Sequence, residues 1–394
     1  MKKLILLLIT TVLLVSCHDD TTEDRQETQY TQTIFMYLPW SGSNMTTPFR
    51  NNIKGLEDAI TKMRGTPGRR VVVFMADSEQ EASLTEIAYR NGRCIHDTLR
   101  KYSFAGNEFT TPAGIANILS DVKVFYDTPH YAMIIGSHGM AWVPKGTVVG
   151  NHTDMAKPHY ENMVDEWKQT RFFGHSTDKT YQTDISDLSK ALTLADIHAD
   201  YILFDDCYMA NIETAYELRN STDMVIGSPT EIMLYGMPYD IMGKAVVGMD
   251  WKAVCSGFLS FYTNYQYPYG TISVIRCAEL DNMAAIMRDI NAAHSPNEEM
   301  LSEIQAYDGL KEHLFFDMHD YVEQLCHDDM SLYSRFTQSL EKLVIAKAAT
   351  EAFYSVYNRS TTPIYTYSGI SISDPSANKA ASHKSETSWW RATH

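Results

Sequence analysis

The chain has 394 residues, of which 44% are hydrophobic, and this is enough apolar material for one large domain or two ordinary ones. Its formal net charge is −16, and no dense cluster of lysine and arginine interrupts the acidic background. Nucleic acids and anionic lipid headgroups are therefore not expected as partners of the folded chain. Separately, we expect a monomer.

The first 17 residues have the pattern of an export signal. Two lysines precede an apolar run over 4–14 that is too short to span a bilayer. The run ends in Leu-Val-Ser-Cys, with Cys17 last, and this resembles the lipobox of bacterial lipoproteins, which is cleaved before a cysteine that then carries lipid. We therefore predict a lipoprotein signal peptide over 1–17, lipidation of Cys17 and a flexible acidic tether over 18–30. The expected location is the cell envelope, on the periplasmic side or the cell surface, with the lipid as the only membrane contact; an ordinary secretory signal with an incidental cysteine is the alternative.

Five cysteines remain after such a cleavage: Cys94, Cys207, Cys255, Cys277 and Cys326. An odd number leaves at least one free thiol in an exported protein. No Cys-x-x-Cys pair is present, so the sequence predicts neither a zinc site nor a dense disulfide framework.

Strand and helix patterns alternate along the rest of the chain. In the first half the predicted elements are a strand over 33–38, a helix over 51–63, a strand over 71–75, an antiparallel strand over 84–89, a helix from Pro112 and a strand over 131–135. In the second half they are a helix over 185–192, a strand over 201–204, a helix over 211–219, a strand over 224–226, a helix over 250–264, a strand over 271–275, a helix over 279–293, helical structure throughout 300–350 and a late strand over 364–372. This alternation predicts an α/β fold with a mostly parallel central sheet and helices on both faces.

No linker composition marks a domain boundary within 31–394, so we predict one continuous domain there. A poorly patterned stretch over 143–183 is too long for a simple connection, and we interpret it as a loop excursion at the edge of the active face. We interpret 250–394 as a C-terminal elaboration of the same domain or a subdomain, with additional helices and strands.

Two of the predicted strands run directly into chemically capable residues. The strand over 131–135 is followed by Gly-Ser-His138-Gly139, and the strand over 201–204 by Asp-Asp-Cys207. The carboxyl ends of neighbouring parallel strands meet at one edge of a sheet, where ligands and catalytic groups collect. A histidine and a cysteine at that edge are a base and a nucleophile placed side by side.

The chemistry of these two side chains suits catalysis. An imidazole at His138 can transfer protons near neutral pH, and Cys207 can attack as a nucleophile once a neighbouring imidazole activates it. The backbone N–H groups of Gly139 and Cys207 are the candidate donors to an oxyanion. A lone histidine or cysteine at a strand end is more often structural, but the pair behind two matching strands favours a catalytic role.

The residues around both junctions resemble the clostripain family of cysteine peptidases, in the wider group that includes caspases, legumains and gingipains. The resemblance rests on Ser-His-Gly at 137–139 and on Phe-Asp-Asp-Cys-Tyr-Met with Glu-Thr-Ala-Tyr-Glu-Leu behind it at 204–218. It continues through 226–229 and 236–239, and Ser-Trp-Trp at 388–390 is similar to the closing segment of the family. By this resemblance the fold is caspase-like.

The resemblance also implies the activity. His138 and Cys207 match the catalytic dyad of a cysteine endopeptidase that acts through a thioester. Asp205 matches the acidic residue at the bottom of the pocket for the residue before the scissile bond, which implies cleavage of proteins or peptides after Arg or Lys. The family usually has a small residue directly before the nucleophile, and here it is Asp206. A carboxylate there raises the thiol pKa if it faces the sulfur, but successive strand residues face opposite sides, so we expect it to point away.

Relatives are often activated by cutting themselves in the loop beyond the histidine. The excursion holds five basic residues at which such a cut is predicted, with no choice among them: Lys145, Lys157, Lys168, Arg171 and Lys179. Some relatives need calcium, but the chain has no Asp-x-Asp-x-Asp-Gly loop, so no metal site or cofactor is predicted and calcium is left open.

Two other functions use the same residues. A catalytically inactive surface lipoprotein could bind a glycan or peptide on a peptidase-like scaffold, and the 24 tyrosines and 6 tryptophans suit carbohydrate stacking. A cysteine hydrolase acting on a non-peptide amide would use the same dyad. Glu213 and Glu217 lie one helical turn apart and either brace the active-site loops or are solvated. We favour the peptidase, because His138, Cys207 and Asp205 are all present.

Overall fold

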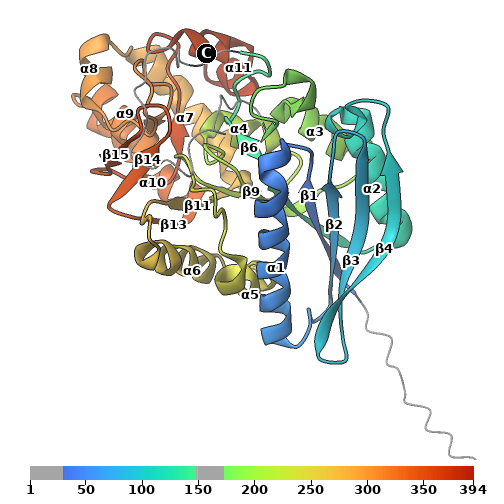
Figure 1. Cartoon of the computed structure of the whole chain (residues 1–394). Helices are drawn as coiled ribbons and strands as arrows, with labels where there is room; N and C mark the ends of the chain where they lie inside the picture. Colours follow the sequence, from blue (N-terminus) through green and yellow to red (C-terminus); the bar gives the residue numbers. More distant parts are fainter. Residues whose placement is uncertain (1–29, 148, 150–172) are drawn as a thin grey trace, which may run out of the picture.

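The structure is a computed structural model that describes residues 30–147, 149 and 173–394 (Figure 1). The expected signal peptide, Cys17 and nearly all of the expected tether lie outside the described residues, as do Lys157, Lys168 and Arg171. Within the described part of the chain, no helix is both long enough and apolar enough to cross a membrane.

A nine-stranded mixed sheet forms the centre of the molecule. Its strands follow the order β13 (Val344–Ala349), β11 (Thr271–Arg276), β10 (Met224–Gly227), β9 (Ala199–Asp205), β5 (His130–Gly136), β1 (Gln32–Leu38), β2 (Arg69–Ala76), β3 (Glu81–Arg90) and β4 (Arg93–Ser103). The five strands from β10 to β2 are parallel to one another, and two antiparallel strands extend the sheet at each edge. The predicted mostly parallel sheet is therefore confirmed.

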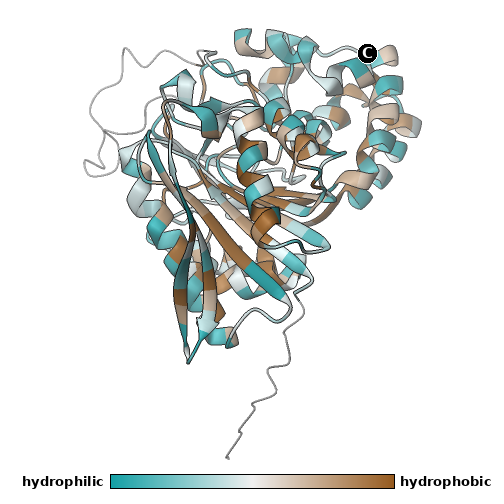
Figure 2. Ribbon diagram, turned by 90° about the vertical axis from the view of Figure 1, so that its right-hand side faces the viewer, coloured by the Kyte–Doolittle hydropathy of each residue, from teal (hydrophilic) through white to brown (hydrophobic). Residues whose placement is uncertain are grey.

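Helices cover both faces of this sheet, also as predicted. The helices on one face are α1 (Thr46–Met63), α5 (Tyr239–Gly248) and α6 (Trp251–Asn264), and those on the other are α2 (Pro112–Phe125), α3 (Ile185–Leu194) and α4 (Ile212–Leu218). Alternate residues of each central strand serve the two cores: Ile34 and Met36 pack toward α1, whereas Phe35 and Tyr37 pack toward α2. Both faces are buried, so the central strands are apolar along their middle residues and appear as brown ribbons between the helical layers in Figure 2.

The C-terminal region contributes β11 and β13 to the sheet and builds a further layer beside it (Figure 1). Its other elements are α7 (Leu280–Ala293), α8 (Glu298–Glu303), β12 (Phe316–Asp317), α9 (Met318–Leu325), α10 (Met330–Leu343), β14 (Ala352–Ser355), β15 (Ser360–Pro363), β16 (Ser371–Ile372) and α11 (Ser388–Thr393). Two short antiparallel pairs, β12 with β16 and β14 with β15, hold this layer together.

Two sequence predictions in this region are wrong. The segment 300–350 is not helical throughout, because β12 interrupts it and its last residues form β13, where antiparallel pairing with β11 overrides the helical preference of an alanine-rich sequence. The predicted strand over 364–372 is limited to its last two residues, since Gly369 has a φ of +86° that breaks the extended path.

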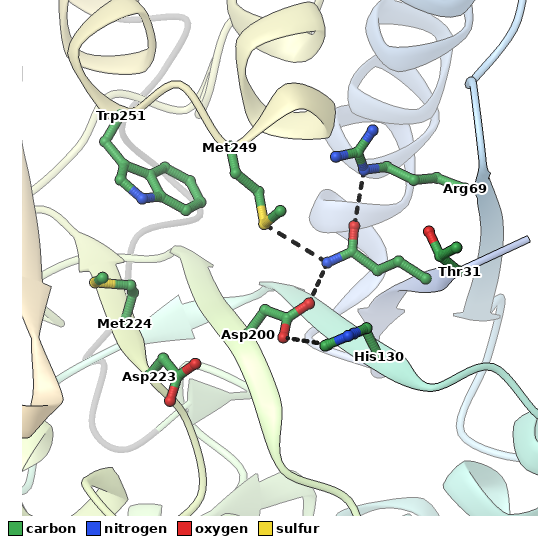
Figure 3. A pocket seen from close by; sticks show the side chains of 9 residues that line it. Thr31, Arg69, His130, Asp200, Asp223, Met224, Met249 and Trp251 are labelled. Carbon is green, nitrogen blue, oxygen red and sulfur yellow. Dashed lines mark hydrogen bonds and ion pairs between the residues drawn. The ribbon is translucent and has the colours of Figure 1, made fainter.

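A polar network lies at the amino ends of the parallel strands (Figure 3). Asp200 accepts from the Gln32 amide at 2.5 Å and lies 3.0 Å from His130 Nδ1, and Arg69 donates to Gln32 at 3.0 Å. These residues line an open cavity of about 400 Å³. His130 therefore lies at the opposite end of β5 from His138, at the edge of the sheet away from the cysteine.

Candidate active site

Parallel pairing of β5 with β9 brings the two predicted junctions together. Gly136 is the register partner of Asp205, so the segments that follow these residues leave the sheet at the same edge. His138, Cys207, Asp205 and Ser137 then line one cavity of about 30 Å³. That volume has room for about one or two water molecules. The structure thus places the predicted base, nucleophile and acidic residue around one small cavity.

Close contact between the two loops explains the glycine after His138. A Cβ on Gly139 would lie 2.6 Å from the Cys207 carbonyl oxygen and 3.1 Å from the Cys207 nitrogen, so any larger residue would push the loops apart. The candidate oxyanion donors, the N–H groups of Gly139 and Cys207, belong to this contact. Tyr208 has a φ of 65°, so the chain turns sharply just after the nucleophile.

The sulfur of Cys207 is enclosed. Its thiol lies 3.9 Å from the Ile232 carbonyl oxygen, and the Ile232 N–H donates to the sulfur at 3.4 Å. Burial raises the pKa of the Cys207 thiol well above its usual value, and the nearby Glu231 carboxylate raises it further. In this conformation the thiol is protonated at neutral pH.

Burial has the opposite effect on the imidazole. It lowers the pKa of His138 to about 4, and the neighbouring charge of His175 contributes to the decrease. A neutral imidazole can accept the thiol proton during attack. His138 belongs to β6 (His138–Gly139), which pairs with β7 (Phe173–Gly174), and β7 pairs with β8 (Gln182–Thr183). The described end of the excursion at 173–174 therefore pairs with the backbone of His138 and Gly139.

Asp205 forms part of the cavity wall with its carboxylate already hydrogen-bonded. Asn52 of α1 donates to Oδ2 at 2.6 Å, and the Met237 N–H donates to Oδ1 at 2.8 Å. Gly236 has a φ of +71°, and a Cβ there would lie 2.5 Å from the Asp205 carboxylate. Burial raises the pKa of Asp205 to about 7. A cation that entered the cavity would meet a carboxyl group poised between its two charge states.

Asp206 faces away from this cavity, as strand alternation predicts. Asp205 and Cys207 line the cavity, whereas the Asp206 carboxylate accepts from the Ser137 N–H beneath the histidine loop. Its pKa is raised well above the usual value, by burial and by the charge of Asp205. Its own charge still raises the pKa of Cys207, so the concern about thiolate formation stands in this conformation.

Sequence analysis missed two residues of the site. Glu231 is buried and accepts from the Tyr208 hydroxyl at 2.7 Å, from Ser355 and from the Val356 N–H at 3.0 Å. It lies between two motifs that sequence analysis quoted, 226–229 and 236–239, but its buried partners could not be read from the chain. Asn52 is a polar residue on the buried face of α1, and its position on that otherwise apolar face is the sequence feature that could have identified it.

Glu213 and Glu217 are not solvated surface carboxylates. Glu213 pairs with Lys384 at 3.0 Å, and both side chains are almost completely buried. Glu217 accepts from the Ser388 hydroxyl. Both residues therefore attach α4, which follows the nucleophile, to the C-terminal region.

All five cysteines of the described chain are free thiols, and four of them are buried. Within the same described residues, no cluster of three or more His, Cys, Asp or Glu side chains could hold a metal ion. The predicted lipidation site, Cys17, lies outside the described residues.

Comparison with known proteins gives one family. A family model described as the clostripain family, Peptidase_C11, matches residues 41–382. No curated protein matches the chain.

Several solved structures are similar to the whole chain or to part of it. A secreted C11 cysteine protease from Bacteroides thetaiotaomicron, called iotapain, is 42% identical with a TM-score of 0.83, covering 93% of this chain and 99% of that chain. An inactive zymogen C11 protease from Parabacteroides distasonis is 27% identical with a TM-score of 0.75 and the same coverage. A clostripain from Bacteroides thetaiotaomicron, in complex with the peptide inhibitor BTN-VLTK-AOMK, is 47% identical with a TM-score of 0.55, covering 57% of this chain and 99% of that chain.

Proposed function

The chain belongs to the clostripain family of cysteine peptidases, and from that premise we propose that it cleaves peptide bonds after Arg or Lys through Cys207 and His138. The observation that carries this proposal is that the thiol, the imidazole and the Asp205 carboxylate line one cavity.

The proposed reaction has two steps. Cys207 Sγ attacks the peptide carbonyl carbon while His138 takes the thiol proton, and the Gly139 and Cys207 N–H groups donate to the oxyanion. The carbon–nitrogen bond then breaks, His138 gives the proton to the leaving amine, and a thioester remains on Cys207. Water adds to the thioester with His138 as the base, which releases the carboxylic acid and restores the thiol.

Basic specificity rests on Asp205. A guanidinium or ammonium group in the cavity would lower the pKa of this carboxyl group, because an opposite charge favours the ionised form. The inhibitor bound by the Bacteroides clostripain relative carries VLTK in its name, which ends in K for lysine, and this supports a basic residue before the scissile bond.

The described conformation is proposed to be the resting, uncut form. A cavity of about 30 Å³ cannot hold a long basic side chain, so Met233 and Leu234, which line it, have to move before substrate enters. We propose that a cut within 143–183 permits this movement, because the excursion begins shortly after His138 in the sequence and its end at 173–174 pairs with the His138 segment. Lys145, which pairs with Asp187 at 3.3 Å, and the exposed Lys179 are the described candidates.

The location and cofactor needs are also proposals. We propose export and anchoring through lipid on Cys17, and the secreted relative iotapain supports export. We propose a monomer that acts on proteins or peptides, with no step assigned to a metal ion. Treatment with a calcium chelator tests that last point.

Three measurements test the function. A fluorogenic peptide with Arg or Lys before the reporter should be hydrolysed, and one with Asp should not. Cys207→Ala should remove all hydrolysis, whereas Cys277→Ala, a matched buried thiol, should retain it. A basic chloromethyl ketone should alkylate Cys207; a correctly folded protein that neither reacts nor hydrolyses would favour the inactive binding protein instead.

N-terminal sequencing tests the proposed cut separately. Wild-type protein should give a second N-terminus within 144–184, and Cys207→Ala should stay intact. Identical intact chains in both preparations would end the self-cleavage proposal and leave the peptidase proposal in place.

A further inference from the structure

One short segment of the C-terminal region, 371–373, touches both catalytic loops. Ser371 donates its N–H to the Ala210 carbonyl at 3.0 Å and its hydroxyl accepts from the Asn211 amide at 3.2 Å, three and four residues beyond the nucleophile. On the other side, the Trp142 indole N–H, four residues beyond the catalytic histidine, donates to the Ser373 hydroxyl at 3.0 Å. The segment therefore spans from the cysteine loop to the histidine loop.

Ser373 uses each of its polar groups for a different element. Its hydroxyl accepts from Trp142, its N–H donates to Glu213 at 3.2 Å, and its carbonyl accepts from the Lys384 ammonium. Ser373 itself is 0% exposed, and Trp142 is 8% exposed. Hydrogen bonds in such a dry setting are costly to break, because the freed groups cannot turn to water.

The ion pair of Glu213 with Lys384 closes this arrangement. Their 3.0 Å contact is buried at both ends, and Glu213 lies in the first turn of α4, the helix after the nucleophile. A buried pair adds little net stability over an apolar pair of the same shape, but it fixes geometry, since neither charge can move without losing the other. The residue types therefore favour a role in positioning.

We propose that Ser373, with Trp142, Glu213 and Lys384, is a positioning junction that holds the histidine loop in register with the cysteine loop. The inference rests on the peptidase activity proposed above and gives the C-terminal region a part in it. Trp142 lies between His138 and the excursion, so a cut in the excursion leaves the histidine loop with one covalent end. The bond from Trp142 to Ser373 then replaces the lost restraint on the imidazole. A displacement of about 1 Å at such a site can cost about 10²-fold in rate.

The test uses two variants, one that removes the donor and one that removes the acceptor of the hydrogen bond between Trp142 and Ser373. Trp142→Phe removes the indole N–H, and Ser373→Ala removes the accepting hydroxyl while keeping both backbone contacts. Each should lower kcat on the Arg reporter about 10-fold to 100-fold with KM nearly unchanged, and slow alkylation of Cys207 by a basic chloromethyl ketone in parallel. The double variant should be no worse than either single variant, because both remove the same bond.

Matched variants separate positioning from general loss of stability. Ser339→Ala removes a buried hydroxyl that accepts from Asn282 at 3.0 Å, and Trp251→Phe removes an indole at the amino edge of the sheet (Figure 3). Both should keep the wild-type kcat even though they lower the melting temperature about as much as Trp142→Phe and Ser373→Ala do. If wild type is active and both Trp142→Phe and Ser373→Ala keep its kcat, the positioning role of this junction is wrong and the proposed function stands. The same conclusion follows if the fold-losses in kcat of the two single variants multiply in the double variant. An inactive wild type would instead overturn the proposed function. If Ser373→Ala does not fold, Trp142→Phe with its kcat, KM and alkylation rate decides the question.

Discussion

Replacing Asp205 by Asn should stabilise the resting protein while it lowers its activity on substrates with a basic residue. Asn keeps the acceptor for the Met237 N–H, and Asn52 can turn its amide to accept from the new NH₂ group, so the hydrogen bonds survive. The change removes only the ability to become charged in a buried place. In wild type at neutral pH, the buried Asp205 side chain is either a charged carboxylate or a protonated carboxylic acid.

The size of the effect follows from the pKa. Burial raises the pKa of Asp205 from 3.8 to about 7, and this difference corresponds to about 4 kcal/mol at 1.36 kcal/mol per pKa unit. Below pH 3.8 the carboxyl group is protonated in both states and the penalty is absent. Between 3.8 and 7 the unfolded chain has released the proton that the folded chain still binds, so the free energy of unfolding falls as pH rises, and above 7 the penalty is constant. Asn does not ionise, so the variant does not have this pH-dependent penalty.

Urea unfolding at pH 5, 6, 7 and 8 measures this, with Cys207→Ala in every chain so that none can cut itself. The variant should gain on its parent by about 1.4 kcal/mol per pH unit from pH 5 to 7 and then stay level. Asp196→Asn is the matched control, because that side chain is fully exposed to solvent. A constant difference between variant and parent across the pH range would refute the reasoning. In chains that retain Cys207, Asp205→Asn should lower kcat/KM on the Arg reporter about 10²-fold to 10³-fold, since an incoming cation loses a buried partner.

Four shorter predictions concern the rest of the site. His138→Ala should abolish hydrolysis while His130→Ala, at the other end of the same strand, should leave kcat/KM within about twofold in the reporter assay. Iodoacetamide should modify Cys207 slowly at pH 7.5 in uncut protein, because burial raises the pKa of this thiol. Peptide mass spectrometry measures the rate of modification before and after processing, and equal rates would contradict this account. Gly139→Ala should cost about 1–3 kcal/mol in urea unfolding and most of the activity, since its Cβ would strike the Cys207 carbonyl, whereas Gly248→Ala meets open space and should be neutral. EGTA should leave hydrolysis unchanged, and a loss that added calcium restores would contradict the metal-free scheme.

The central strands were predictable because each is buried on both faces. Residues 71–75 and 131–135 are unbroken apolar runs, and such runs identify the strands of a covered parallel sheet. β4 gave no such signal, since all of its side chains are exposed or half-buried and charged residues interrupt its apolar ones. β13 was misassigned because its strand state depends on β11, which lies about 70 residues earlier in the chain.

The candidate site divides in the same way. His138, Cys207 and Asp205 follow predicted strands directly, so the topology alone brings them to one edge. Glu231 contacts Ser355 and Ser373 contacts Trp142, each more than 100 residues away in the sequence, and no local pattern encodes such contacts. The small volume of the cavity could not be predicted either, because it depends on how side chains from distant parts of the chain pack.

The strand order has a consequence for any chain interrupted between 150 and 172. Strands β1 to β5 come from the first piece and β9, β10, β11 and β13 from the second, so the seam of the resulting heterodimer is the β5–β9 pair at the middle of the sheet. Each fragment would carry only one of the two reacting groups, the imidazole on the first and the sulfur on the second. Dissociation would require splitting a hydrophobic interior, so the nicked molecule behaves as one particle that reveals two bands only when denatured.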